Sequence, residues 1–183
     1  MNTLCLLNLN IWNYNEPWAV RRGLIAGLIA RTRPDVVALQ EVRYQSWLDP
    51  RHQADQILDE LAERYHIVWQ PAAYWVLDGG AQWEGLAVLS RYPIVDQATV
   101  PLERDPNDPR NPFLRRVLGA QVRVGDAHLW VFDTHYPLSE RARARVAPIT
   151  LDFVRQTAGE CPFVLAGDFN AQPDELAIRF LAG

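Results

Sequence analysis

Lysine is absent from this chain, so all 18 basic residues are arginines, and the formal net charge over 183 residues is −4. An acidic balance argues against avid non-specific binding to nucleic acid, because such binding requires many contacts to phosphate.

Cysteine is scarce: Cys5 and Cys161 are the only two, and neither belongs to a C-x-x-C pair or a Cys/His cluster. This excludes the usual zinc-binding spacings, and we expect both cysteines to be small core residues without a disulfide.

The sequence also contains no apolar run long enough to cross a membrane and no basic, cleavable leader at Met1. These absences favour a cytoplasmic protein. No repeat or linker divides the chain, and 183 residues are enough for one domain with a substantial core. We therefore expect a single domain over residues 1–183, and the sequence leaves its oligomeric state open.

Four apolar runs rich in Val, Leu or Ile end abruptly at polar side chains, and such runs are typical of strands buried on both faces. The polar residues at their ends are Asn10, Glu41, His135, Asp168 and Asn170. A side chain at the end of a buried strand is held rigidly at the edge of a sheet, where sites form. This set is rich in oxygen and includes one imidazole, which suits a hard divalent cation such as Mg²⁺.

Helical periodicity between these runs predicts a helix from Pro17 to Arg31 and another that Ser139 caps. Residues 71–83 are expected to be a loop that turns at Gly79-Gly80, and residues 103–112 an exposed loop. Strands and helices mixed in this way predict an α/β fold, with two packed sheets and the helices outside.

Five short motifs occur in order along nearly the whole chain. They are Leu9-Asn10-Ile11, Leu39-Gln40-Glu41-Val42, residues 84–91, Thr134-His135 and Gly167-Asp168-Phe169-Asn170. Together they resemble the endonuclease/exonuclease/phosphatase family, the deoxyribonuclease I-like metal-dependent phosphoesterases. The resemblance implies a two-sheet α/β sandwich flanked by helices, with the site at one end.

The site chemistry follows from metal preference and from the resemblance. Glu41 is the expected Mg²⁺ ligand, with Mn²⁺ as an alternative, because Mg²⁺ keeps several waters and needs only one or two carboxylates. Asn10 either orients the metal shell or contacts the phosphate. The resemblance implies that Asp168 positions the attacking water and that Asn170 donates its amide to a phosphate oxygen.

His135, by the same resemblance, faces the phosphate and donates a hydrogen bond to it. Glu84 is expected to pair with His135 and to raise its pKa, although a purely structural role for Glu84 stays open.

Asp168 and Asn170 have an alternative interpretation as a turn after a strand. Arg115 and Arg116, and the arginines at 141, 143 and 145, either contact phosphate or form solvated surface.

The chain departs from the family pattern in one respect: it contains no Asp-His pair, whereas the family carries a Ser-Asp-His motif near its C-terminus. We therefore expect a domain that lacks the C-terminal strands. The predicted function is metal-dependent hydrolysis of phosphoesters, of the phosphodiesterase or nuclease type. The alternative is a catalytically incomplete fragment or phosphate-binding module.

The substrate stays open between a small molecule, a lipid headgroup and nucleic acid. Three tryptophans outside the regular elements, Trp47, Trp75 and Trp83, either stack on bases or lipid headgroups or pack their loops onto the fold.

Overall fold

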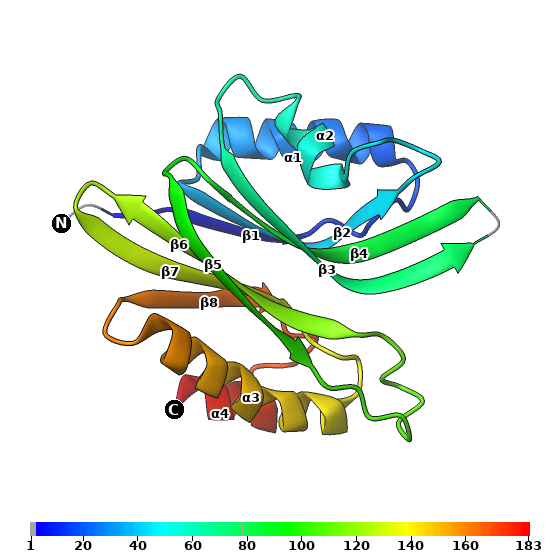
Figure 1. Cartoon of the computed structure of the whole chain (residues 1–183), viewed down its shortest axis with the longest axis vertical. Coiled ribbons are helices and arrows are strands. Elements are labelled where there is room, and N and C mark those ends of the chain that lie inside the picture. The colour runs from blue at the N-terminus through cyan, green and yellow to red at the C-terminus, as the bar shows by residue number, and fades with distance from the viewer. Residues whose placement is uncertain (1–2, 78) are drawn as a thin grey trace.

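The computed structural model describes residues 3–77 and 79–183, which form two four-stranded sheets and four helices (Figure 1). The first sheet has the order β1 (Leu6–Asn10), β2 (Val36–Gln45), β4 (Gly80–Ser90), β3 (His66–Leu77). The second has the order β5 (Ile94–Leu102), β6 (Arg115–Val124), β7 (Ala127–His135), β8 (Phe163–Asp168). The helices are α1 (Trp18–Thr32), α2 (Gln53–Leu58), α3 (Glu140–Ala158) and α4 (Leu176–Ala182).

The two sheets pack face to face, with α1 and α2 over the first and α3 and α4 over the second (Figure 1). Apolar side chains fill the space between the sheets, including Val88, Leu118 and Val131. Strands β2 and β7 contribute to the core on both of their faces, as their continuous apolar runs predicted. The predicted two-sheet α/β sandwich is therefore confirmed.

Two parallel strand pairs bring the polar strand ends to one edge. Strand β1 pairs with β2 so that Asn10 lies opposite Gln40, and β7 pairs with β8 so that His135 lies opposite Asp168. Parallel neighbours need a crossover, which α1 and α3 supply. All other strand pairs are antiparallel.

The expected loop at residues 71–83 is wrong, because most of this segment belongs to the β3–β4 hairpin. Pro71 is tolerated because β3 is an edge strand and its register shifts between Pro71 and Ala73. Gly85 opposite it cannot carry a side chain, because a Cβ there would lie 2.0 Å from the Gln70 carbonyl oxygen.

The segment 103–112 is not the fully exposed loop that its charges suggested. The side chains of Asp105, Asp108 and Asn111 are buried. Asp105 pairs with Arg141 and Arg145, which are therefore not simply a solvated helix face. These ion pairs attach the loop to the first turns of α3.

The two cysteines form no disulfide, as expected, but Cys5 is exposed and is not a core residue. Within the described ranges, none of the helices is long and apolar enough to cross a membrane.

Candidate active site

Asn10 connects the two sheets at the edge where the polar strand ends meet. Its Nδ2 donates to Glu41 Oε1 at 3.0 Å and to Asp168 Oδ2 at 2.9 Å. Its Oδ1 accepts from the Trp12 backbone N–H at 2.8 Å. Asn10 thus donates to both carboxylates through one amide nitrogen. Its hydrogen bond to Asp168 brings two residues that lie 158 positions apart in the sequence into one cluster.

Glu41 lies at an irregularity in β2, where the pairing with β4 shifts between Leu39 and Val42. Its backbone has a φ of 58°, which is left-handed and costs a non-glycine residue about 1–2 kcal/mol. Asn13 Nδ2 donates to Glu41 Oε2 at 2.7 Å, so both carboxylate oxygens are held by amides. Strained backbone of this kind persists where surrounding contacts over-determine it, commonly at functional sites.

Asp168 is held in a structured turn at the end of β8. Gly167 before it has a φ of 148°, and a Cβ there would lie 2.2 Å from the Thr134 carbonyl oxygen. Asp168 Oδ1 accepts from the Asn170 backbone N–H at 3.0 Å, and Asn170 Nδ2 donates to the Tyr136 carbonyl at 2.9 Å. One Asn170 amide proton is used here, and its other proton is available to a ligand.

His135 is buried between Arg115 and Asp168. Arg115 Nη1 lies 2.9 Å from His135 Nδ1, and His135 Nε2 lies 3.8 Å from Asp168 Oδ2. A guanidinium only donates, so Nδ1 accepts and the ring proton sits on Nε2, toward Asp168. Burial, with the nearby charge of Arg115, lowers the pKa of His135 to about 4, against the opposing effect of Asp168 and Glu41. The imidazole is therefore neutral at pH 7.

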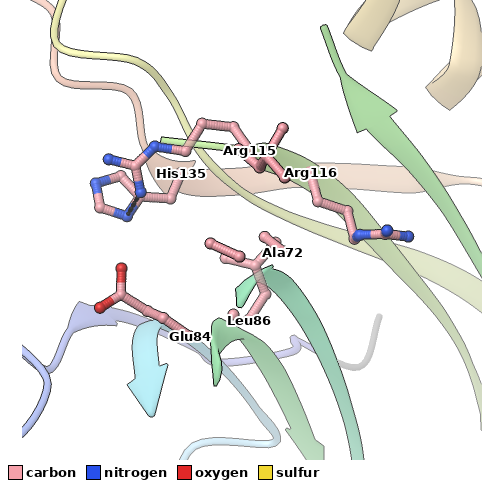
Figure 2. A pocket seen from close by; sticks show the side chains of 9 residues that line it. Ala72, Glu84, Leu86, Arg115, Arg116 and His135 are labelled. Carbon is pink, nitrogen blue, oxygen red and sulfur yellow. Dashed lines mark hydrogen bonds between the residues drawn. The ribbon is translucent and has the colours of Figure 1, made fainter. Parts of the chain in front are cut away.

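Glu84 does not pair with His135, so the expected rise in the pKa of that histidine is wrong. Glu84 instead forms an ion pair with Arg43, whose Nε lies 3.1 Å from Glu84 Oε2. Glu84, Arg115 and His135 line one narrow cleft of about 10 Å³, which has room for about one water (Figure 2). Burial lowers the pKa of Arg115, and the charge of Glu84 is the largest influence that opposes this shift.

A wider, open cleft of about 740 Å³ adjoins the carboxylate cluster. Asn8, Asn10 and Gln40 line one side of it, and Asp168 and Asn170 line the other. A substrate can therefore reach the Asp168 carboxylate from solvent without displacing the core.

A polar network, exposed at Asn8 and fully buried at Gln40 and Asp133, supports this cleft. Gln40 Nε2 donates to Asn8 Oδ1 at 2.9 Å and to Asp133 Oδ1 at 2.6 Å. Asn8 Nδ2 in turn donates to the Gly167 carbonyl at 3.1 Å. Asp133 is fully buried, and this burial raises its pKa well above the usual carboxyl value. The network links the two sheets directly beneath the Asp168 turn.

The donor set fits Mg²⁺ better than a metal that requires several side-chain ligands. Among residues 3–77 and 79–183, no group of three or more His, Cys, Asp or Glu side chains is arranged to hold a metal. Glu41 and Asp168 offer carboxylate oxygens within reach of one amide, Asn10. Mg²⁺ typically binds one or two carboxylates and keeps its remaining waters, so this set is sufficient.

The structure thus brings together Asn10, Glu41, His135, Asp168 and Asn170, and places Glu84 beside them on Arg43. Sequence analysis missed Asn13. Asparagines at 8, 10, 13 and 15 directly after the first apolar run were the available signal.

The fold and the polar edge together define a two-sheet α/β sandwich with its candidate site at the ends of parallel strands. The sequence profile of the endonuclease/exonuclease/phosphatase family matches residues 7–183, and the chain belongs to this family. Members of the family are hydrolases that act on phosphoesters. No curated protein sequence matches the chain.

Solved structures share the fold. A mannosyl-6-phosphatase from Bacteroides thetaiotaomicron is 19% identical with a TM-score of 0.79, over 98% of this chain and 70% of that one. The human Nocturnin catalytic domain with bound sulfate is 20% identical with a TM-score of 0.76, over 98% of this chain and 69% of that one. An endonuclease/exonuclease/phosphatase from Beutenbergia cavernae is 28% identical with a TM-score of 0.75, over 93% of this chain and 48% of that one.

Proposed function

We propose that this chain hydrolyses phosphoester bonds with a divalent metal ion bound at Glu41. The observation that carries the proposal is the double hydrogen bond of Asn10 to Glu41 and Asp168. It holds two carboxylates from different sheets together, next to the Arg115–His135 pair. Opposite charges are thus adjacent, as a site for a metal and a phosphoryl group requires.

Each residue has a role that its surroundings support. Glu41 holds Mg²⁺, or Mn²⁺ in its place, and the ion supplies charge neutralisation at the phosphate when bound. Asn10 and Asn13 orient the Glu41 carboxylate through the hydrogen bonds to its two oxygens. Asp168, held by the Asn170 backbone N–H, positions the attacking water.

The other side of the site addresses the phosphate. His135 carries its proton on Nε2, so it donates a hydrogen bond to a phosphate oxygen from a neutral ring. Arg115 fixes that tautomer and adds a positive charge. Asn170 offers its second amide proton. Glu84 orients Arg43 through their ion pair, which makes Glu84 a positioning residue in this proposal.

The structural neighbours support an oxyanion ligand. One is named a mannosyl-6-phosphatase, and another holds a sulfate, which is a tetrahedral oxyanion like phosphate. The net charge of −4 favours a small phosphoester or a lipid headgroup over long nucleic acid. That residues 1–183 form one domain, incomplete at its C-terminal end, and that the protein is cytoplasmic stay predictions.

The first prediction concerns Glu41→Gln, which keeps the shape of the side chain but removes the charge that binds the metal. We expect Mg²⁺-dependent hydrolysis of a chromogenic phosphodiester to fall at least about 100-fold. Rates of hydrolysis measured with added Mg²⁺, Mn²⁺ or EDTA test this expectation. The control is Glu103→Gln, an exposed glutamate in another loop, which should retain wild-type rates.

Two results would contradict the proposal. One is hydrolysis that persists in Glu41→Gln, and the other is wild-type protein that neither hydrolyses phosphoesters nor binds inorganic phosphate. Calorimetric binding of phosphate without hydrolysis would instead support the catalytically incomplete phosphate-binding module.

A further inference from the structure

A second cleft lies on the opposite face of the first sheet from the candidate active site. It has a volume of about 300 Å³, and its walls include Tyr44, Trp69 and Trp83. Successive side chains of a strand point to opposite faces. Arg43 and Glu84 form the ion pair beside the active site, so their strand neighbours Tyr44 and Trp83 face the other way. This cleft is therefore separate from the phosphoesterase site.

Aromatic rings form half of the lining, which consists of eight residues. Tyr44 and Trp83 are paired across β2 and β4 with ring centroids 5.3 Å apart. The His52 ring lies against Trp69, with centroids 4.7 Å apart. Tyr74 extends the aromatic surface beyond Trp83, at 5.0 Å. Trp83 thus belongs to a cleft lining and does not pack a loop onto the sandwich. The faces of such rings carry negative electrostatic potential.

Two charged residues line the cleft, Arg51 and Asp55, and two further carboxylates outside the lining pair with Arg51. Arg51 pairs with both Asp49 and Asp59, so its positive charge is already shared between two carboxylates. Asp55, which also lines the cleft, lies 3.3 Å from His52 Nε2. Among these described groups, three carboxylates face one guanidinium.

His52 does not neutralise Asp55. Its Nδ1 accepts a hydrogen bond from the Asp55 backbone N–H at 3.3 Å, so this nitrogen carries no proton. Burial, the largest effect, lowers the pKa of His52 and also favours the neutral ring. With His52 neutral, the four charged groups sum to −2.

We propose that this cleft binds a small organic cation of the substituted ammonium type. Aromatic faces together with a nearby carboxylate are the chemistry that recognises such cations. A volume of about 300 Å³ is at the small end of ligand pockets, which suits a compact headgroup-sized cation. Anionic ligands are repelled by Asp55 here, while the active site attracts them through Arg115.

The test is a titration of the wild-type chain with choline and, separately, with 3,3-dimethylbutan-1-ol, a neutral molecule of the same shape. The tryptophan indole N–H signals in NMR spectra report binding at constant ionic strength. We expect choline to bind at least about tenfold more tightly than the neutral alcohol. This readout needs no hydrolytic activity, so its failure and the failure of the proposed function are distinguishable.

Two variants, each of which lacks one carboxylate, test whether Asp55 is responsible for the binding of choline. Asp55→Asn removes the carboxylate at the cleft and should weaken choline binding about tenfold. Asp96→Asn removes an exposed carboxylate on β5 and should leave it unchanged. Equal binding of the neutral alcohol, an unaffected Asp55→Asn variant, or no response to choline in the folded protein would each overturn the proposal.

Discussion

Two residues of the candidate site adopt states that are unfavourable for isolated residues of their type. Glu41 has left-handed backbone, and His135 is an ionisable ring buried beside a guanidinium. The cluster is nevertheless held, because amides occupy both Glu41 oxygens and Arg115 occupies the His135 Nδ1. We therefore expect these residues to have a measurable effect on the stability of the folded state.

The pKa of His135 predicts an acid-dependent loss of stability. The folded-state value of about 4 is below the ordinary value of 6.5, so the unfolded chain binds more protons between these values. The contribution of neutral His135 is complete above pH 6.5 and is lost as the pH falls toward 4. The loss amounts to at most about 3 kcal/mol.

Urea unfolding of the wild type and of His135→Asn, at pH 7 and pH 4.5 in EDTA, measures this loss. The variant should lose less stability between the two pH values, because its side chain does not titrate. Equal losses in both proteins would show that His135 is not responsible.

Gly85 gives a prediction about backbone packing. Gly85→Ala should destabilise the fold by more than about 2 kcal/mol, because the new methyl group meets the Gln70 carbonyl. Gly125→Ala is the matched control. It has a left-handed φ of 63° but open space around it, and should cost only about 1 kcal/mol. Thermal unfolding compares them, and equal effects would contradict the close packing of β3 on β4.

Elements were predictable where a hydrophobic pattern runs unbroken. Helix α1 was expected between Pro17 and Arg31 and spans Trp18–Thr32, and Ser139 caps α3 as expected, accepting from the Ala142 backbone N–H. The β3–β4 hairpin was not predicted, because Pro71 and the paired glycines at 79 and 80 are signals of a loop. Their tolerance depends on β3 being an edge strand, which only pairing decides.

A substitution at Asp105 tests whether the ion pairs of this residue attach the segment 103–112 to α3. Asp105→Asn removes the buried charge that pairs with Arg141 and Arg145, and should cost about 1–2 kcal/mol. Urea unfolding gives the free energy, and hydrogen exchange should become faster in this segment. A variant as stable as the wild type, with unchanged exchange, would show that the loop is held by other contacts.

At the scale of the whole molecule, the two sheets meet through polar as well as apolar contacts. Asp133 on β7 accepts from Gln40 on β2 in the fully buried interface. Its raised pKa means that the folded state binds more protons than the unfolded state above the ordinary carboxyl range. The stability from this group is therefore greatest at low pH and is lost as the pH rises.

Asp133→Asn should remove that dependence. The amide carries no charge, and it supplies a donor where both Asp133 Oδ2 and Gln40 Oε1 lack a partner. We expect the variant to be about 1 kcal/mol more stable than the wild type at pH 7, with the advantage shrinking toward pH 4. Unfolding curves at both pH values measure it, and a variant that is less stable at pH 7 would contradict the prediction.

The sequence by itself determined most of the strands, the class of fold and the polar residues that meet at one edge, because a buried strand needs apolar residues throughout and polar ones only where it ends. Asn10, Glu41, His135, Asp168 and Asn170 were found in this way. Only the tertiary structure decided which side chains pair. Glu84 contacts Arg43 and not His135, and Asn13 reaches Glu41, because strand register and a local bulge set those distances. The second cleft likewise exists only after β2 and β4 align Tyr44 with Trp83, since side-chain alternation needs a register before it can assign faces.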